Sequence, residues 1–195
     1  MIVLVLPDIS VDDERLERAQ HGDQEAIADV YRSYFDPIYQ FVRLRVGDAQ
    51  LAEDLTSDVF VKFVKALKHD KAPHTSLRGW IFAVARNVIY DQYGKEPELP
   101  VETLDQWLTT DVDTNPEVQA IRTISIERAR QAISLLAPSH QEVLMLRFDQ
   151  QLSLQETAEI MNKKVNAIKA LQFRAVNTLR QLLSDPEIDD QTGVE

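Results

Sequence analysis

The chain of 195 residues is 44% hydrophobic and 27% charged, with a formal net charge of -11, which is ordinary for a folded soluble protein. No apolar run approaches the ~20 residues of a membrane-spanning helix, so membrane insertion is not expected. The absence of cysteine excludes disulfides and cysteine-ligated zinc and fits a cytoplasmic location. The four histidines lack metal-ligand spacing, so neither a metal nor another cofactor is predicted.

The negative charge is concentrated in three segments. Residues 1–25 hold seven acidic and two basic residues, residues 96–119 hold seven acidic and no basic residues, and residues 184–195 hold five acidic and no basic residues. Residues 26–95 and 126–183 instead carry a small excess of basic residues. Because a polyanion responds to the local field more than to total charge, nucleic acid is compatible with these two segments.

Five glycines and no useful alternation of apolar and polar residues predict an all-α fold class. A leader, residues 1–10, precedes a first small helical domain, residues 11–95. Asp36-Pro37 has the form of an N-cap with proline in the first helical turn, so one helix is expected to end there and another to begin. Ser76 is the predicted cap of the last helix. The helices expected in this domain span residues 11–20, 24–35, 37–46, 49–67 and 77–93.

Composition changes at residues 96–117 (EPELPVETLDQWLTTDVDTNPE), which hold three prolines and seven acidic residues without periodicity. This segment is predicted to be a flexible acidic linker. It joins the first domain to a second small helical domain, residues 118–183, which is followed by an acidic tail, residues 184–195. A capping box at Ser139 and Glu142 is expected to open a helix in the second domain.

The second domain contains a helix-turn-helix pattern. Ser153 and Glu156 are spaced as a capping box at the start of a short helix. Asn162 stands where a left-handed turn residue is needed before a longer helix, residues 165–183. Two helices joined by so short a turn, the second one basic, are typical of this DNA-binding motif.

The long helix of this pattern and the turn before it are basic. Five lysines and arginines and no acidic residue stand between residues 163 and 180. The second helix of a helix-turn-helix lies in the major groove, where it contacts base edges and phosphates. A helical hairpin with a solvated basic face is the alternative interpretation. The candidate DNA-binding residues are Lys163, Lys164, Asn166, Lys169 and Arg174.

Residues 133–183 contain a leucine-rich start, a proline, and the motifs QEVLMLRF, LSLQETAEI and VNAIK in this order. This arrangement resembles region 4 of the bacterial sigma-70 family of sigma factors. The resemblance implies that the basic helix reads the minus-35 promoter element and that the domain contacts the beta flap of core RNA polymerase.

The segment AEDLTSDVFVKFVKAL places Asp54 and Asp58 one turn apart. A carboxylate pair suits a metal-dependent nuclease or an acidic helix face that binds a basic partner. No further ligand pattern supports the metal, so the acidic face is favoured. The segment resembles the region 2 helix that contacts the beta-prime coiled coil of core RNA polymerase. This resemblance implies polymerase contacts by Asp54, Leu55, Asp58 and Phe60.

The segment TSLRGWIFAVARNVIYDQYGK resembles the region 2 helix that engages the minus-10 element and receives an unpaired base. The resemblance implies that Asn87, with Arg86 beside it, meets the base edge. It also implies that Arg78 and Lys95 contact phosphates. The apolar residues of this helix are expected in the core: Trp80, Ile81, Val84, Ala85, Val88 and Ile89.

Two family regions joined by a short linker resemble the extracytoplasmic-function (ECF) group of sigma factors. This resemblance implies a protein without an enzymatic site that binds core RNA polymerase, recognises promoter DNA at the minus-35 and minus-10 elements and promotes melting. It also implies a cytoplasmic protein, associated with the nucleoid when bound to polymerase, and an anti-sigma factor as a further partner. The alternatives are a helix-turn-helix regulator that acts without polymerase and a nuclease built on Asp54 and Asp58.

Overall fold

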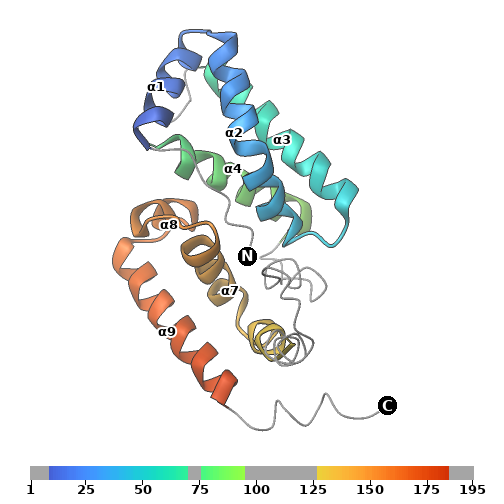
Figure 1. Ribbon diagram of the computed structural model, residues 1–195, viewed down its shortest axis with the longest axis vertical. Helices are drawn as coiled ribbons and strands as arrows, with labels where there is room; N and C mark the ends of the chain where they lie inside the picture. Colours follow the sequence, from blue (N-terminus) through green and yellow to red (C-terminus); the bar gives the residue numbers. More distant parts are fainter. Residues whose placement is uncertain (1–8, 70–75, 95–126, 185–195) are drawn as a thin grey trace, which may run out of the picture.

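A computed structural model describes residues 9–69, 76–94 and 127–184, and the regular structure within these segments is entirely helical (Figure 1). The predicted all-α class is therefore confirmed. The leader up to residue 8, the linker, Lys95 and the tail beyond residue 184 lie outside the described residues. No described helix is both long enough and apolar enough to cross a membrane. The elements are α1 (Ile9–Gln20), α2 (Gln24–Arg43), α3 (Ala49–Lys68), α4 (Leu77–Tyr93), α7 (Pro138–Leu144), the π-helical turn η1 (Met145–Asp149), α8 (Leu154–Ile160) and α9 (Val165–Ser184).

Most helix boundaries follow from local sequence signals. Ser76 caps α4, because its side-chain oxygen accepts a hydrogen bond from the Gly79 N–H at 3.0 Å. Ser153 and Glu156 form the predicted capping box at the start of α8, each side chain accepting from the other's backbone N–H. Asn162 adopts the predicted left-handed conformation, with φ of 50°, between α8 and α9.

The expected break at Asp36-Pro37 is wrong, since α2 continues through Pro37 to Arg43. A proline inside a helix lacks an N–H donor and costs about 3 kcal/mol. The helix nevertheless buries Tyr34, Ile38 and Phe41 completely. Each large side chain contributes roughly 1.5–3 kcal/mol on burial, so tertiary packing outweighs the local cost.

The expected capping box at Ser139 is also wrong. The N-cap of α7 is Ala137, with Pro138 in the first turn and no side-chain hydrogen bond to the cap. Glu142 is buried instead and faces arginines from another part of the fold. The π-helical turn η1 directly follows α7, and the sequence signals considered above did not predict it.

The helices form two packed units. The first unit consists of α1–α4, and the second consists of α7, η1, α8 and α9 with the helical residues 127–134. In the second unit Ala158, Ile160 and Ile168 are buried between the helices of the helix-turn-helix, as predicted, and Val165 packs partly buried beside them. The short helix α8 packs against α4, so the two units are in direct contact (Figure 1).

Replacing the two serines in turn separates the true cap from the mistaken one. Ser153→Ala removes a side-chain cap and should lower the free energy of unfolding by about 1 kcal/mol. Ser139→Ala removes no cap and should change it by no more than about 0.5 kcal/mol. Urea unfolding followed by circular dichroism measures both values, and equal losses in the two variants would contradict this assignment.

Candidate nucleic-acid interface

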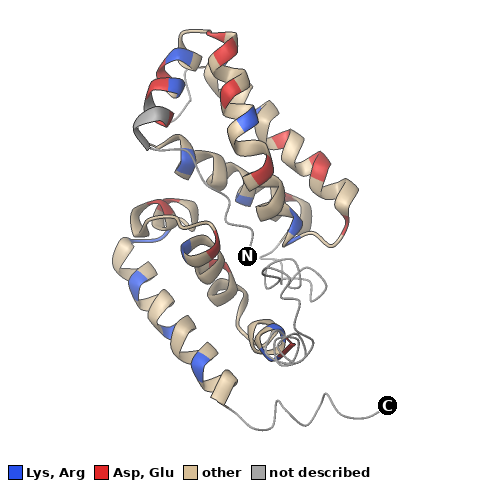
Figure 2. Ribbon diagram, in the orientation of Figure 1, with Lys and Arg blue, Asp and Glu red and all other residues tan. Residues whose placement is uncertain are grey.

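The outer face of α9 is exposed, basic and free of acidic residues. Ile168, Leu171 and Ala175 turn towards the core of the second unit. The opposite side of the helix and the turn before it face solvent, and Figure 2 shows basic residues along this helix. All five residues predicted to contact the minus-35 element are exposed, so the structure brings them together on one surface: Lys163, Lys164, Asn166, Lys169 and Arg174.

A large aromatic side chain that the sequence analysis did not consider lies on this surface, next to Arg174. Phe173 is 69% exposed, one helical turn beyond Lys169 and two turns beyond Asn166. Its spacing of four residues from Lys169 and seven from Asn166 was the sequence signal that could have placed it on the same helix face. An apolar ring among hydrogen-bonding side chains suits a surface that meets both base edges and thymine methyl groups.

Helix α4 presents two different faces, and they divide the residues predicted to contact the minus-10 element. Asn87 is exposed and shares one face with Trp80 and Val84, at spacings of seven and three residues. Arg78 and Arg86 lie on another face, which packs against the second unit. The structure therefore separates Asn87 from the two arginines.

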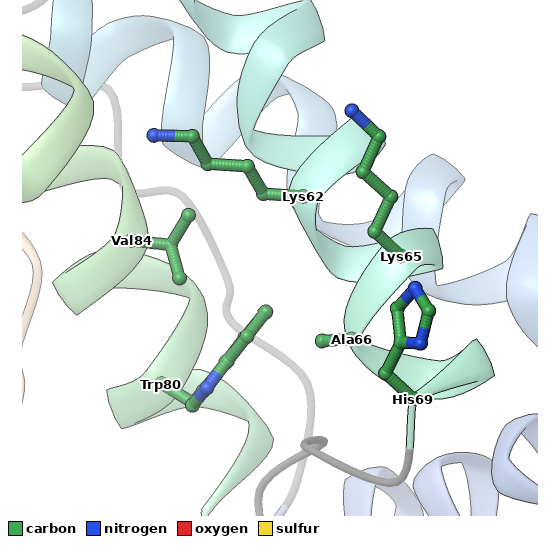
Figure 3. Close-up of a pocket in the computed structure, with 6 residues that line it drawn as sticks. All are labelled: Lys62, Lys65, Ala66, His69, Trp80 and Val84. Carbon is green, nitrogen blue, oxygen red and sulfur yellow. The ribbon is translucent and has the colours of Figure 1, made fainter.

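A pocket of about 350 Å³ opens beside the Asn87 face, between α3 and α4 (Figure 3). Lysines of α3 and His69, the residue that follows this helix, stand across from the indole of Trp80 and the side chain of Val84 on α4. Trp80 and Val84 are partly buried and pack against the edge of the core, whereas the other four apolar residues predicted with them are fully buried. The lining residues are Lys62, Lys65, Ala66, His69, Trp80 and Val84.

The arginine face of α4 meets a buried carboxylate of α7. The Arg86 guanidinium donates to both oxygens of Glu142, with Nε at 2.9 Å and Nη2 at 3.3 Å, and also to the Tyr90 hydroxyl. Arg45 Nη2 lies 3.7 Å from the same carboxylate, and the Arg45 and Glu142 side chains are only 3% and 4% exposed. Burial lowers the pKa of Arg45 to about 10, and the Glu142 carboxylate opposes this change.

A second set of contacts joins the start of α4 to α8. Arg78 Nη2 donates to the carbonyl oxygen of Gln150 at 2.8 Å, and its Nε lies 3.9 Å from the Glu156 carboxylate. Gly79 permits this approach, because a Cβ there would lie 3.3 Å from Glu159 Oε2 and 3.6 Å from Glu156 Cγ. Arg78 and Arg86, which were predicted to contact the minus-10 element, thus interact with carboxylates and a carbonyl oxygen of the same chain.

Helix α3 carries the predicted polymerase contacts in two environments. Asp54 and Asp58 are exposed on one side of the helix, and Figure 2 shows acidic residues along α3. Leu55 and Phe60 are each 6% exposed and belong to the core, so they support the helix from within. The Phe60 ring packs at 4.8 Å from that of Tyr31, a residue of α2 that is 46% exposed.

No group of three or more metal-ligating side chains occurs in the part of the chain that the structure describes. The Asp54–Asp58 pair therefore has no third ligand among those residues, and the nuclease alternative gains no support from the geometry.

Comparison with known proteins places both units in one family. Residues 30–96 match Sigma-70 region 2, and residues 132–181 match Sigma-70, region 4. The chain is 36% identical over 173 residues to the ECF RNA polymerase sigma factor BldN of Streptomyces coelicolor, covering 88% of this chain and 66% of BldN. It is 30% identical over 154 residues to the RNA polymerase sigma factor YlaC of Bacillus subtilis, covering 78% of this chain and 88% of YlaC.

A solved structure of CnrH in complex with the cytosolic domain of CnrY has a similar fold. Its TM-score is 0.64 at 21% sequence identity, and the match covers 88% of this chain and 96% of CnrH. Sigma region 2 corresponds to most of the first unit and sigma region 4 to most of the second. The chain therefore belongs to the ECF group of the sigma-70 family and is a sigma factor of transcription initiation.

Proposed function

We propose that this sigma factor binds core RNA polymerase through α3, recognises a minus-35 element with α9, and uses α4 to help melt a minus-10 element. The observation that supports this most strongly is the outer face of α9, which is exposed and free of acidic residues although the whole chain carries a net charge of -11. That face follows the left-handed turn at Asn162, as the second helix of a helix-turn-helix does.

On α9 we assign base reading to Asn166 and Lys169, near the start of the helix. Arg174 and the two lysines of the turn are assigned to phosphates, where they fix the position of the helix on the duplex. Phe173 is placed for apolar contact with a thymine methyl group.

Substitution of Lys169 tests this assignment. Lys169→Ala should weaken promoter binding and reduce the slope of log K against log salt by about one, since one cation at the DNA surface is lost and fewer counterions are released on binding. Arg32→Ala removes an exposed cation from α2, on the other unit, and serves as the matched control. An unchanged salt slope for Lys169→Ala would show that Lys169 does not contact the DNA.

For the minus-10 element we assign the unpaired base to the pocket between α3 and α4. The Trp80 indole offers a stacking surface, Asn87 on the same helix face offers hydrogen bonds to a base edge, and Lys62 and Lys65 supply positive charge for the backbone. Extruding a base costs a few kcal/mol, and a pocket that holds it offsets part of this cost.

The proposed protein partners are core RNA polymerase and a protein that holds the sigma factor inactive. Exposed Asp54 and Asp58 support a contact with a basic coiled coil of the beta-prime subunit. The complex of CnrH with CnrY supports a second protein partner for this chain, an anti-sigma factor. The proposal also includes a contact of region 4 with the beta flap of the polymerase. It further includes the absence of enzymatic activity and a cytoplasmic location with association with the nucleoid.

Run-off transcription with purified core polymerase tests the proposed function. The chain should co-purify with core polymerase and start transcripts from promoters of its own genome. A regulator acting without polymerase would bind duplex DNA and yield neither result. A nuclease would cut DNA with magnesium alone and lose this activity on Asp54→Asn.

A further inference from the structure

We propose that the acidic tail, residues 184–195, binds the outer face of α9 and competes with promoter DNA for it. The tail follows α9 directly and holds five acidic residues and no basic residue. The competition rests on the proposed function, because it requires that α9 binds DNA. The docking of the tail on α9 does not depend on that function.

The basic residues of α9 and of the turn before it lack an anionic partner in the part of the chain that the structure describes. None of them forms an ion pair with another described residue. Exposed arginines of the first unit, such as Arg18 and Arg32, are by contrast paired with nearby carboxylates. The surface of α9 therefore offers five positive charges to an anionic segment: Lys163, Lys164, Lys169, Arg174 and Arg180.

The tail starts at a fixed point and is long enough to reach these charges. Arg128 donates a hydrogen bond to the carbonyl oxygen of Leu183 at 3.2 Å, which ties the end of α9 to the second unit. Pro186 disfavours a helical conformation of the residue before it, so α9 is not expected to continue. Residues 185–195 can span about 36 Å when extended, and the twenty residues of α9 measure about 30 Å.

The position of α9 favours its own outer face over the first unit as the target of the tail. In Figure 1, α9 begins beside α8 and runs away from the first unit, so the tail starts at the end that is far from it. Figure 2 shows that the basic residues of α9 are spread along the helix towards this end. The tail therefore meets the charges of α9 first when it turns back.

The tail also matches the apolar part of this surface. Ile188 has two acidic residues on each side within three positions. On α9, the 69% exposed side chain of Phe173 stands beside Arg174 and one turn from Lys169. A DNA duplex presents phosphates and thymine methyl groups to such a surface. The tail presents carboxylates and an isoleucine, so both ligands suit the same side chains.

The physical chemistry of exposed charges makes this docking weak and reversible. Each exposed ion pair contributes little, but the covalent connection gives the tail an effective concentration in the millimolar range. Salt weakens the contact, because the Debye length falls from about 10 Å at 0.1 M to about 3 Å at 1 M. We expect the tail to lower the affinity for duplex DNA by about 5-fold at low salt.

Paramagnetic relaxation in the full-length chain tests the docking. Because the chain has no cysteine, Thr192→Cys introduces the only attachment site for a nitroxide. The amide signals of residues 166–174 should lose intensity most strongly, and the loss should disappear at about 1 M salt. A loss that is greatest at Ser184 and falls steadily towards residue 166 would show an undocked tail and overturn the proposal.

A mixed sample identifies the molecule that supplies the tail. It combines chains that carry the nitroxide with isotope-labelled chains that lack it. No signal of α9 should lose intensity in this sample, because the tail binds the helix of its own chain. A loss of intensity would mean that the tail binds a second copy of the chain, and it would overturn the proposal.

Neutralising the tail tests the competition with DNA. The neutral-tail variant should bind a short duplex of mixed sequence about 5-fold more tightly than the parent at about 50 mM salt, and it should lose the relaxation effect on residues 166–174. Its four substitutions are Asp185→Asn, Glu187→Gln, Asp189→Asn and Asp190→Asn.

A matched control separates docking from a change in net charge. It carries four neutralised acidic residues that are exposed on the first unit, so its net charge equals that of the neutral-tail variant. Its affinity for the duplex should rise by less than about 2-fold. Equal gains in the two variants would show an effect of net charge alone and overturn the competition. The control substitutions are Glu14→Gln, Glu17→Gln, Asp36→Asn and Glu53→Gln.

The two proposals fail in different ways. If the relaxation effect shows a docked tail but the neutral-tail variant binds no duplex, the docking stands and the assignment of α9 to DNA fails. If Lys169→Ala weakens promoter binding and the neutral-tail variant binds DNA like the parent, only the present inference fails.

Discussion

Replacing Glu142 with alanine should weaken the association of the two units by about 3–5 kcal/mol and split one cooperative unfolding transition into two. The reason is that Arg45 and Arg86 share this carboxylate in a buried site, and removing one partner of such a cluster leaves uncompensated charge. The arginines regain water only if the interface opens. Once the interface has opened, no contact joins the core of one unit to the core of the other, so the units unfold independently.

Urea unfolding followed by two probes measures this effect. Fluorescence of Trp80 reports on the first unit, provided that Trp107 is replaced by phenylalanine, and far-ultraviolet circular dichroism reports on all helices. The two transitions should coincide in the parent and separate in Glu142→Ala. Glu127→Ala removes a carboxylate whose partner, Arg130, lies one turn away in the same unit, so its transitions should stay coincident. Coincident transitions in both variants would show that Glu142 does not couple the units.

Reversing the charges of Asp54 and Asp58 to lysine should nearly abolish binding to core polymerase. Both carboxylates are exposed on one side of α3, so the change leaves the core of the first unit intact. Like charges across an interface with a basic coiled coil would cost several kcal/mol, which corresponds to a loss of affinity of about 100-fold or more. Titration of labelled core polymerase with the sigma factor gives the affinity.

Glu14→Lys, an exposed charge reversal on α1, controls for the change in net charge. It should reduce polymerase binding far less than the double variant. Binding of the isolated minus-35 duplex should be nearly unchanged in the double variant, since α9 lies in the other unit. Equal loss of polymerase binding in Glu14→Lys and in the double variant would point to long-range charge and away from a contact at α3.

Local signals predicted the elements well where the relevant energy is local. Ser76, Ser153 and Asn162 act through their own backbone neighbours, so their positions in the sequence were sufficient to place helix ends. Pro37 was misread because the side chains that α2 buries outweigh the local cost of a proline. Glu142 was misread as a cap for a similar reason, since its partners lie 56 and 97 residues earlier in the chain.

The candidate site shows the same difference between features that depend on local sequence and features that depend on tertiary contacts. The exposed face of α9 follows from helical periodicity, which is why its basic residues could be grouped from the sequence. Periodicity also separates Asn87 from Arg78 and Arg86, but it does not reveal which face of α4 meets a second unit. The pocket at Trp80 depends on the packing of α3 beside α4, and the role of Gly79 depends on the approach of α8. Neither tertiary contact has a local sequence signal.

Because the chain is synthesised from its N-terminus, the ion pairs at Glu142 form later than the contacts within the first unit. The carboxylate that covers Arg86 is added 56 residues later, which is about 3–11 seconds at the usual pace of a ribosome. Helices α1–α4 pack mostly with one another, so they can fold during that interval. In each new molecule the arginine face of α4 therefore stays uncovered by the second unit for this interval, until the last helices emerge and pack against it.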